Sequence, residues 1–375
     1  MHILHNRLSL LSLLLLASLA TMAQTTTTNA ATTKRDSLKP QKHIGDETIL
    51  LQGITVMGRN EARQLRESGM PVSVMTSKEL QGTASSMNDV LARVAGVTIR
   101  NTGGVGSASR LSVRGLEGKR LGLFVDETAM NQFSNFITLN DIPTDMIARI
   151  EIYKGVVPIT FGADALGGAV NIVTRRSKRN YANLSYTFGS FNTHKSTLRI
   201  GQRLTDNISL ELNAYQNYSD NNYKVFTKYL DVHTGVFSKE PRWFTRFHDR
   251  YHNEALIGRL NIFNEKWADK LSFGLNYNQE YKQIQNANLM QIVFGGKYRT
   301  SHTYSSSMEY EKKNIIRGLS FALTGRYDLT TTRNTDEEPR QYAWDGTYRT
   351  KATKGEVQHI LQTFEGKTGY ITSHI

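Results

Sequence analysis

Two glycine-rich segments have residue types that could bind a phosphate group. In Asn101–Ser109 the spacing is G-x-G-x-x-S, which lacks the third glycine of a dinucleotide-binding loop. Gly115–Arg120 resembles a P-loop, but its glycines stand too close together and Arg120 occupies the place of the residue that binds magnesium. Both segments miss residues that phosphate binding needs, so we expect no nucleotide site.

Residues that often carry catalysis or bind metals form no convincing set. The chain has no cysteine, which excludes thiol nucleophiles, Cys-ligated zinc, iron–sulfur clusters and disulfides. Its ten histidines include no H-E-x-x-H motif, and Ser109 and Ser112 lack the context of a nucleophile elbow. We therefore expect no enzyme, no catalytic residue, no bound metal and no cofactor.

The stretch from Glu151 to Arg176 begins as a strand, breaks at Gly155, and resumes as a strand after Gly167 and Gly168. Glycine allows positive φ angles and close approach of two backbones. We expect the glycines here, Gly162 included, to serve packing rather than catalysis.

Charged residues accompany these predicted strands. Arg114, Glu151 and Lys154 stand inside or beside them. They either face water or pair with a polar wall that encloses the domain. The formal net charge of the chain is +13. Its charges are scattered, so most of them are expected on a solvated surface.

The first 58 residues divide into three segments. Residues 1–23 are predicted to be a secretory signal peptide, because a basic start and an apolar run too short to span a membrane precede small residues. Residues 24–48 are Thr-rich and polar and are predicted to form a flexible tether. Residues 49–58, "ILLQGITVMG", are either the first strand of the next domain or a docking strand for another protein.

Residues 59–176 are predicted to form a compact α/β domain. Met87, Val90 and Leu91 have helical spacing within a capped segment that ends at Gly96. Strands are expected at "GVTIR", "RLSVRG" and "LGLFVDE". A short helix should begin at Pro143 and lead into the strand that contains Glu151.

After Arg176 apolar and polar residues alternate strictly. Leu184, Tyr186 and Phe188 share one face, and segments such as "NISLELNAY" and "KLSFGLNYNQ" repeat the pattern. Connections near 203–207, 264–270 and 311–318 are short, whereas those near 219–249, 282–297 and 330–355 are long. This pattern favours an outer-membrane β-barrel over a soluble sandwich.

About eight strands fit between Tyr181 and Ile375, the last one weakly. An eight-stranded barrel cannot hold a domain of roughly 120 residues. Either the two domains lie side by side, or the chain is the N-terminal part of a larger barrel. The ending "GYITSHI" has no clear strand, which favours the second interpretation.

Six motifs in order resemble the TonB-dependent receptors of bacterial outer membranes: "LLQGITVMGRN", "MNDVLARVAGVTI", "GGVGSASRLSVRG", "LGLFVDE", "IPTDMIARIEIYKG" and "FGADALGGAVNIVT". The resemblance implies an α+β plug domain (59–176) followed by antiparallel barrel strands (177–375), about a third of a 22-stranded barrel. The chain departs from the family pattern at Ala95 and Glu127, where proline and glycine are usual.

The resemblance also implies a mechanism. The plug, which faces the periplasm, blocks a barrel in the outer membrane, and TonB with its inner-membrane energising complex grips an exposed strand and displaces the plug. The docking residues would be Leu51, Gly53, Ile54, Thr55, Val56 and Met57. The structural motifs of the plug would be Gly96, Gly104, Arg114, Gly115, Asp126, Glu151, Lys154, Gly155, Gly162, Gly167, Gly168 and Asn171. The glycines after Glu151 would meet the inner wall of the barrel.

The implied function is active uptake of a scarce ligand, and the partners are TonB, outer-membrane lipid and a small chelated-metal or cofactor ligand, not nucleic acid. Aromatic and basic residues mix in the long segment after Asn217, which suits an anionic ferric siderophore, with haem and cobalamin as alternatives. An ordinary basic surface explains this mixture equally well. The second functional hypothesis is a non-transporting plug-type binding or signalling protein.

Overall fold

The computed structural model describes residues 61–67, 69–80, 86–126, 128–129, 139–158, 161, 167–175, 180–287, 290, 293–316, 318–352 and 355–373. No helix within these residues is long and apolar enough to cross a membrane.

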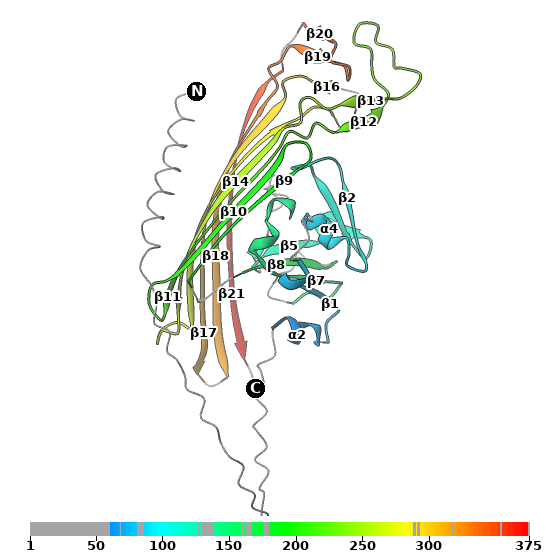
Figure 1. The fold of residues 1–375 in the computed structure, drawn as a ribbon. Helices are drawn as coiled ribbons and strands as arrows, with labels where there is room; N and C mark the ends of the chain where they lie inside the picture. The colour runs from blue at the N-terminus through cyan, green and yellow to red at the C-terminus, as the bar shows by residue number, and fades with distance from the viewer. Residues whose placement is uncertain are drawn as a thin grey trace, which may run out of the picture. The chain divides into compact units, whose positions relative to one another are not determined.

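The first part of the described chain is built on a five-stranded sheet (Figure 1). Its strands, in spatial order, are β1 (Val72–Thr76), β7 (Ile147–Tyr153), β8 (Ala169–Thr174), β5 (Gly122–Val125) and β6 (Thr128–Ala129). Only β5 and β8 run parallel within this described sheet. A second small sheet contains β2 (Val97–Asn101), β3 (Ser109–Val113) and β4 (Leu116–Glu117).

The helices of this part are short. They are α2 (Glu61–Arg66), α3 (Ser77–Leu80), α4 (Met87–Leu91) and the 3-10 turns η2 (Gly118–Arg120), η3 (Leu139–Asp141) and η4 (Thr144–Met146). The expected helix therefore ends at Leu91, before Gly96. It starts at a capping box, in which the Ser86 hydroxyl accepts from Asp89 N and the Asp89 carboxylate accepts from Ser86 N.

The core of this part lies between α4 and the two sheets. Met87, Val90 and Leu91 of the helix are buried and belong to one cluster with Ile150 and Ile172 of the central strands. Strand β7 alternates isoleucine with charged residues, and β8 is buried on both faces over its first four residues. Within the sheet, β8 is hydrogen-bonded on its two edges to β7 and β5.

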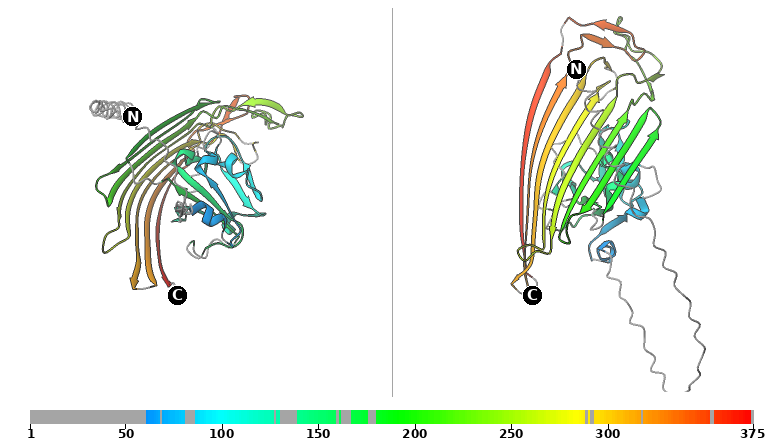
Figure 2. Two further views of the ribbon diagram at one scale, coloured as in Figure 1. Left: turned by 60° about the horizontal axis from the view of Figure 1, so that its bottom comes forward. Right: turned by 60° about the vertical axis from the view of Figure 1, so that its left-hand side comes forward.

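The second part is one eight-stranded antiparallel sheet, which we call the wall (Figure 2). Its strands run in chain order from one edge to the other. They are β9 (Tyr181–Gly189), β10 (Thr193–Arg203), β11 (Ile208–Ser219), β14 (Tyr251–Phe263), β15 (Lys270–Gln283), β17 (Tyr298–Ile316), β18 (Leu319–Thr335) and β21 (Val357–Ser373). The predicted strand count is confirmed.

The two faces of the wall differ as the alternation predicts. The apolar face is exposed, with Leu184, Leu275 and Phe188 each about two-thirds accessible to solvent (77%, 69% and 67%). The other face carries buried polar side chains, among them Glu211, Asn253 and Thr332. A soluble sandwich would bury its apolar face, so this arrangement is that of a barrel wall.

Two details of the wall differ from the sequence expectation. The predicted turn at 311–318 is largely strand, because β17 continues to Ile316 with a register shift after Lys312. The ending also contains a strand, since β21 pairs with β18 over its whole length from Val357 to Ser373. Strand β21 is rich in Thr, Gln and Gly, so backbone pairing rather than apolar alternation defines it.

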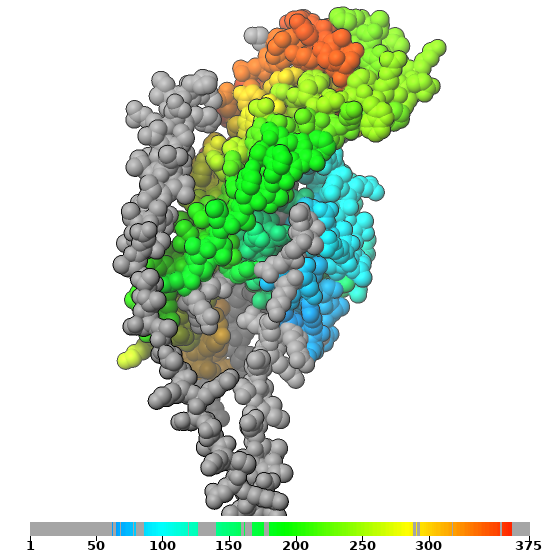
Figure 3. Space-filling view, viewed as in Figure 1, coloured from blue at the N-terminus to red at the C-terminus, as the bar shows by residue number. Residues whose placement is uncertain are grey.

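The long connections gather at one end of the wall (Figure 3). They contain the hairpin β12 (Lys224–Thr227) and β13 (Arg242–Thr245), and a small sheet of β16 (Val293–Phe294), β19 (Arg340–Tyr342) and β20 (Tyr348–Thr350). The Trp344 indole is buried where they meet and donates to Met290 O at 2.6 Å. These connections therefore pack against one another instead of standing separately.

Candidate functional site

The closest contact between the two parts is made by residues Gly103–Ser107, which we call the glycine loop. The amide of Asn221, just after β11, accepts from Val105 N at 2.9 Å and donates to Val105 O at 2.9 Å. Both bonds are made to the backbone of Val105, as the bonds of a neighbouring strand would be. The wall therefore holds the loop without requiring a particular side chain at position 105.

The glycines of this loop leave no room for a side chain. A Cβ at Gly104 would overlap the Asn221 amide, and one at Gly106 would overlap the Tyr251 ring. Gly106 also has φ +72°, which L-residues rarely adopt. Asn221 and Tyr251 thus fill the space in front of the loop.

Further side chains of the wall hold the same end of the plug segment. The Lys282 ammonium donates to Gly106 O and lies 3.4 Å from Ser107 Oγ. The fully buried Tyr251 hydroxyl donates to the Asp141 carboxylate at 2.9 Å, and Asn217 donates to Asp141 O at 3.1 Å. Buried polar groups need such partners, so the polar face of the wall matches the polar surface of the plug segment.

Asp126 makes the ion pair between the two parts. Its carboxylate lies 3.3 Å from both terminal nitrogens of Arg259 in β14. It also accepts from Thr174 N at 2.8 Å and from Thr174 Oγ1 at 2.6 Å. Asp126 has φ +50°, a conformation that Asp and Asn adopt more readily than other non-glycine residues.

Replacing Asp126 with asparagine should weaken this contact between the plug segment and the wall without straining the backbone. The change removes the charge that faces Arg259 and should lower the free energy of unfolding by about 1–3 kcal/mol, the usual range for charge-assisted hydrogen bonds. Urea unfolding of the purified protein in detergent measures it. Asp206→Asn, in an exposed turn of the wall, is the matched control and should have no measurable effect.

The other charged residues singled out in the sequence make their contacts inside the plug segment. The buried Glu151 carboxylate accepts from Arg149 Nε at 2.7 Å, Tyr153 OH at 3.0 Å and Asn171 Nδ2 at 2.9 Å. Arg114 is exposed and donates to Lys154 O at 2.9 Å. These contacts join the strands of the plug segment and do not reach the wall, contrary to pairing across the interface.

The glycines after Glu151 also pack inside the plug segment. A Cβ at Gly167 would lie 2.8 Å from Arg120 O, and Gly168 has φ +137° beside Tyr153 O. Within the described residues the glycine loop, rather than Gly167 or Gly168, lies against the eight-stranded wall, so the expectation that the glycines after Glu151 meet the barrel stays a prediction.

The remaining predicted motif residues are turn positions or lie outside the described residues. Gly96, Gly115 and Gly155 have positive φ angles, and Gly96 O accepts from Arg114 N at 2.7 Å. Gly162 and the docking residues, Leu51 and Gly53 to Met57, lie outside the described residues.

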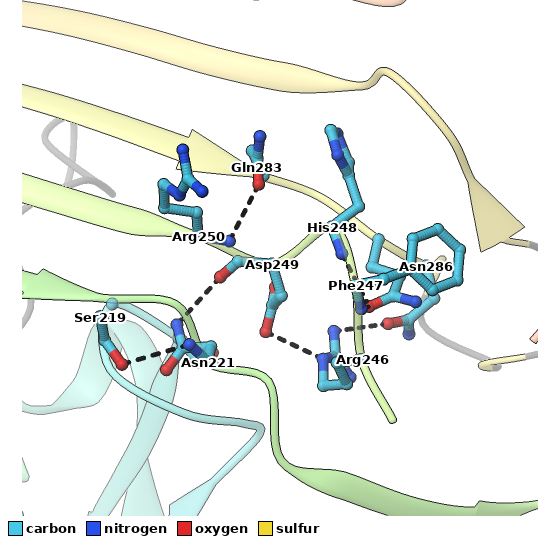
Figure 4. A network of polar contacts seen from close by, with 12 residues as sticks. Ser219, Asn221, Arg246, Phe247, His248, Asp249, Arg250, Gln283 and Asn286 are labelled. Carbon is cyan, nitrogen blue, oxygen red and sulfur yellow. Dashed lines mark hydrogen bonds and ion pairs between the residues drawn. The ribbon is translucent and has the colours of Figure 1, made fainter. Parts of the chain in front are cut away.

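Residues Arg246–Arg250, which connect β13 to β14, form a second polar cluster next to the glycine loop (Figure 4). Gln285 accepts from Phe247 N at 3.0 Å and from His248 N at 3.3 Å, and Gln283 accepts from Arg250 N at 3.2 Å. Asp249 O accepts from the same Asn221 amide that holds Val105. Side chains of the wall thus hold this segment, which we call the 246–250 segment, by its backbone.

Arg246 and Asp249 of the 246–250 segment are buried, whereas Arg250 is exposed. The Arg246 guanidinium lies between the rings of Tyr223 and Trp344, 5.2 and 5.8 Å from their centroids. Its Nε is 2.9 Å from Asp249 Oδ2, an ion pair without the alignment of a hydrogen bond. Burial raises the pKa of Asp249, against the effect of Arg246, and burial lowers the pKa of His248.

The hairpin β12–β13 presents an exposed face with aromatic and basic side chains. Phe226 and Trp243 pair across the strands with ring centroids 5.1 Å apart and are 56% and 66% exposed. Lys224 and Lys228 lie two residues to either side of Phe226 and are exposed as well. We call these four residues the aromatic–basic face. It can stack on flat rings and attract negative charge.

His248 and His252 have the H-x-x-x-H spacing that can bind zinc on a helix. Here His252 lies in β14 and His248 precedes the strand, so the spacing does not align them as it would on a helix. Among the described residues, no group of three or more His, Cys, Asp or Glu side chains could hold a metal ion.

Comparison with known proteins supports the geometry. Residues 64–169 match the family model of the TonB-dependent Receptor Plug Domain. A mutant of the ferric enterobactin receptor PfeA from Pseudomonas aeruginosa is similar at 16% identity over 82% of this chain and 46% of the receptor, with a TM-score of 0.57. The ferric-catecholate import receptor Fiu from E. coli matches at 12% identity over 82% of this chain and 46% of Fiu, with a TM-score of 0.53.

The copper transporter OprC is a further similar structure, at 14% identity over 82% of this chain and 49% of OprC, with a TM-score of 0.54. The chain therefore spans about half the length of these solved receptors. At such identities the likeness shows the fold. Residues 64–169 thus match the plug domain of TonB-dependent receptors, and the strands after them have the fold of part of the barrel in these solved structures.

Several site residues were not foreseen from the sequence. Asn221, Arg259 and Lys282 hold the plug, yet each is one of many polar residues in a polar-rich wall. The only local signal was the position of Asn221 at the end of a predicted strand, where Asn is common in turns. Which wall residue meets which plug residue depends on the register of the whole sheet.

Proposed function

We propose that the chain acts in a TonB-dependent outer-membrane receptor that takes up a ferric siderophore. The observation that carries the proposal is a plug domain held by buried polar contacts against a wall whose outer face is apolar. Polar contacts between plug and wall suit a plug that must be moved. The exposed apolar face of the wall supports a location in a membrane, and the signal peptide predicted from the sequence supports the outer membrane.

A catecholate siderophore with iron is anionic and carries aromatic rings. The aromatic–basic face offers the complementary chemistry, and residues 219–250 contain six basic against four acidic side chains. PfeA and Fiu, which have similar folds, are described as receptors for ferric enterobactin and ferric catecholates. Haem and cobalamin are the alternative ligands.

Growth on defined iron sources tests the proposal. Cells that carry the intact gene should grow on a particular ferric siderophore when other iron is withheld, and cells without the gene should not. Equal growth of the two strains on every siderophore, together with a difference on haem or cobalamin, would indicate that the ligand is haem or cobalamin instead. No difference on any source would contradict uptake.

Replacing Trp243 with alanine should weaken ligand binding. The change removes half of the exposed aromatic pair, and such stacking contributes about 0.5–1.5 kcal/mol beyond its buried area, or roughly two- to tenfold in affinity. Equilibrium binding of the ferric siderophore measures it. Trp267→Ala is the matched control, since Trp267 is exposed (52%) in a turn between β14 and β15 at the other end of the wall. Equal losses in the two variants would contradict a ligand role for this face.

We also propose that residues 49–58 dock to TonB by adding a strand to its sheet. An apolar, β-branched segment on a polar tether suits this mode of binding. A peptide of residues 46–60 should bind the C-terminal domain of TonB weakly, and Val56→Pro should abolish binding because proline cannot donate to the ladder. Calorimetry of both peptides measures this. Equal binding by the two peptides, or binding by neither, would count against the docking strand.

A further inference from the structure

The side chain of Asn221 makes hydrogen bonds both to the glycine loop of the plug and to the 246–250 segment. Its amide nitrogen donates to Val105 O at 2.9 Å and to Asp249 O at 3.0 Å, and its oxygen accepts from Val105 N. Both hydrogens of the amide nitrogen are therefore used (Figure 4).

The position of this amide leaves it little freedom. Asn221 is 1% exposed and has φ +50°, and its N donates to Ser219 Oγ at 3.2 Å. Gly104 lies so close that even a Cβ there would overlap the amide. The side chain is therefore fixed by its own backbone, by Ser219 and by the loop it holds.

We propose that Asn221 couples the 246–250 segment to the plug, so that displacing the segment loosens the glycine loop. Hydrogen bonds between nitrogen and oxygen weaken beyond about 3.2 Å, so a shift of the Asp249 backbone by about an ångström breaks that bond or draws the amide away from Val105. The inference concerns the mechanics of the chain and holds whichever ligand the receptor takes.

The segment has a second anchor that makes the coupling testable. Gln285 is fully buried and holds the segment at Phe247 N and His248 N, and these side-chain hydrogen bonds do not involve the glycine loop. Gln285→Ala should therefore free the segment without touching the plug directly. If Asn221 transmits the change, exchange of the Val105 N–H will respond, although this group donates to Asn221 and not to Gln285.

Hydrogen exchange of the Val105 amide in the purified protein is the readout. Asn221→Gly removes the side chain and suits φ +50°, and it should speed this exchange by about tenfold or more, the effect of losing hydrogen bonds that each contribute about a factor of five to ten. Gln285→Ala should speed it by a smaller factor. In the double variant, Gln285→Ala should add nothing to the exchange of Val105.

This non-additive effect on Val105 exchange would distinguish coupling through Asn221 from a general loss of stability. Asn253→Ala is the matched control: Asn253 is equally buried, and its contacts to Asn278 and Gln279 O lie within the wall, so Val105 exchange should stay unchanged. Asn221→Asp keeps the size, the backbone conformation and the acceptor for Val105 N but loses both donors, so in this variant Gln285→Ala should no longer change Val105 exchange.

Three results would overturn the proposal. The first is unchanged Val105 exchange in the Asn221→Gly variant. The second is a Gln285→Ala variant in which the Phe247 and His248 amides exchange faster while Val105 does not. The third is an equal effect of Gln285→Ala on Val105 with and without Asn221. None of these results bears on uptake of a siderophore, so the two proposals fail separately.

Discussion

Replacing Gly106 with alanine is expected to displace the glycine loop from the wall and to destabilise the seated plug by about 2–5 kcal/mol. Two costs add. The left-handed conformation, φ +72°, costs an L-residue about 1–2 kcal/mol. The new Cβ also overlaps the Tyr251 ring, which is fully buried and bonded to Asp141, and overpacking of this kind costs about 1–3 kcal/mol.

Gly115 provides the control for the Gly106 variant. Its φ is +80°, but nothing lies within 4 Å of an added Cβ, so Gly115→Ala should cost only the conformational part. Urea unfolding and hydrogen exchange of residues 102–107 measure the two effects. Equal destabilisation by the two variants would mean that the Tyr251 ring does not limit the space at Gly106.

Replacing Glu151 with alanine is expected to lower the stability of the plug by about 3–5 kcal/mol, the usual range for breaking a buried ion pair. Glu151 is 3% exposed and accepts from Arg149, Tyr153 and Asn171, on its own strand and on β8. The change removes the acceptor for all three donors at once. Thermal unfolding followed by tyrosine fluorescence measures the loss.

Two further variants serve as comparisons for Glu151→Ala. Glu151→Gln keeps the size and one acceptor oxygen and should lose less, about 1–3 kcal/mol. Glu117→Ala removes an exposed carboxylate from the same domain and should stay within about 0.5 kcal/mol of the parent. A Glu151→Ala variant as stable as the Glu117→Ala variant would show that the buried network does not hold the plug sheet together.

The architecture could be predicted because it rests on short-range patterns. Alternation at Leu184, Tyr186 and Phe188 marks an outer face whether or not its neighbours are known, and the structure exposes all three. The strand that contains Glu151 and the turn at Gly96 are likewise local features. Alternating isoleucines define the strand, and Gly96 allows the positive φ angle of the turn.

The misplaced details depend on pairing between strands. The segment at 311–318 has charged and asparagine residues typical of a turn, yet β18 offers partners that keep β17 extended to Ile316. Strand β21 has weak alternation, and its hydrogen bonds to β18 define it. Pairing with a neighbouring strand, which local composition does not report, decides the structure of both segments.

The site was harder to predict than the fold for a related reason. The sequence shows Gly104 and Gly106 as positions of high backbone freedom. It contains no nearby signal that Asn221 and Tyr251 contact them. The same holds for Asp126 and Arg259, which are 133 residues apart. Polar residues on the inner face of a wall look alike until the plug is placed against them.

Uptake of a ferric siderophore by cells that carry the intact receptor tests the central claim most directly. Binding at the cell surface should persist when the proton gradient of the inner membrane is collapsed, whereas accumulation inside the cell should stop, because moving the plug requires energy delivered through TonB. Accumulation that continues unchanged without the gradient would contradict the account of a plug opened by TonB.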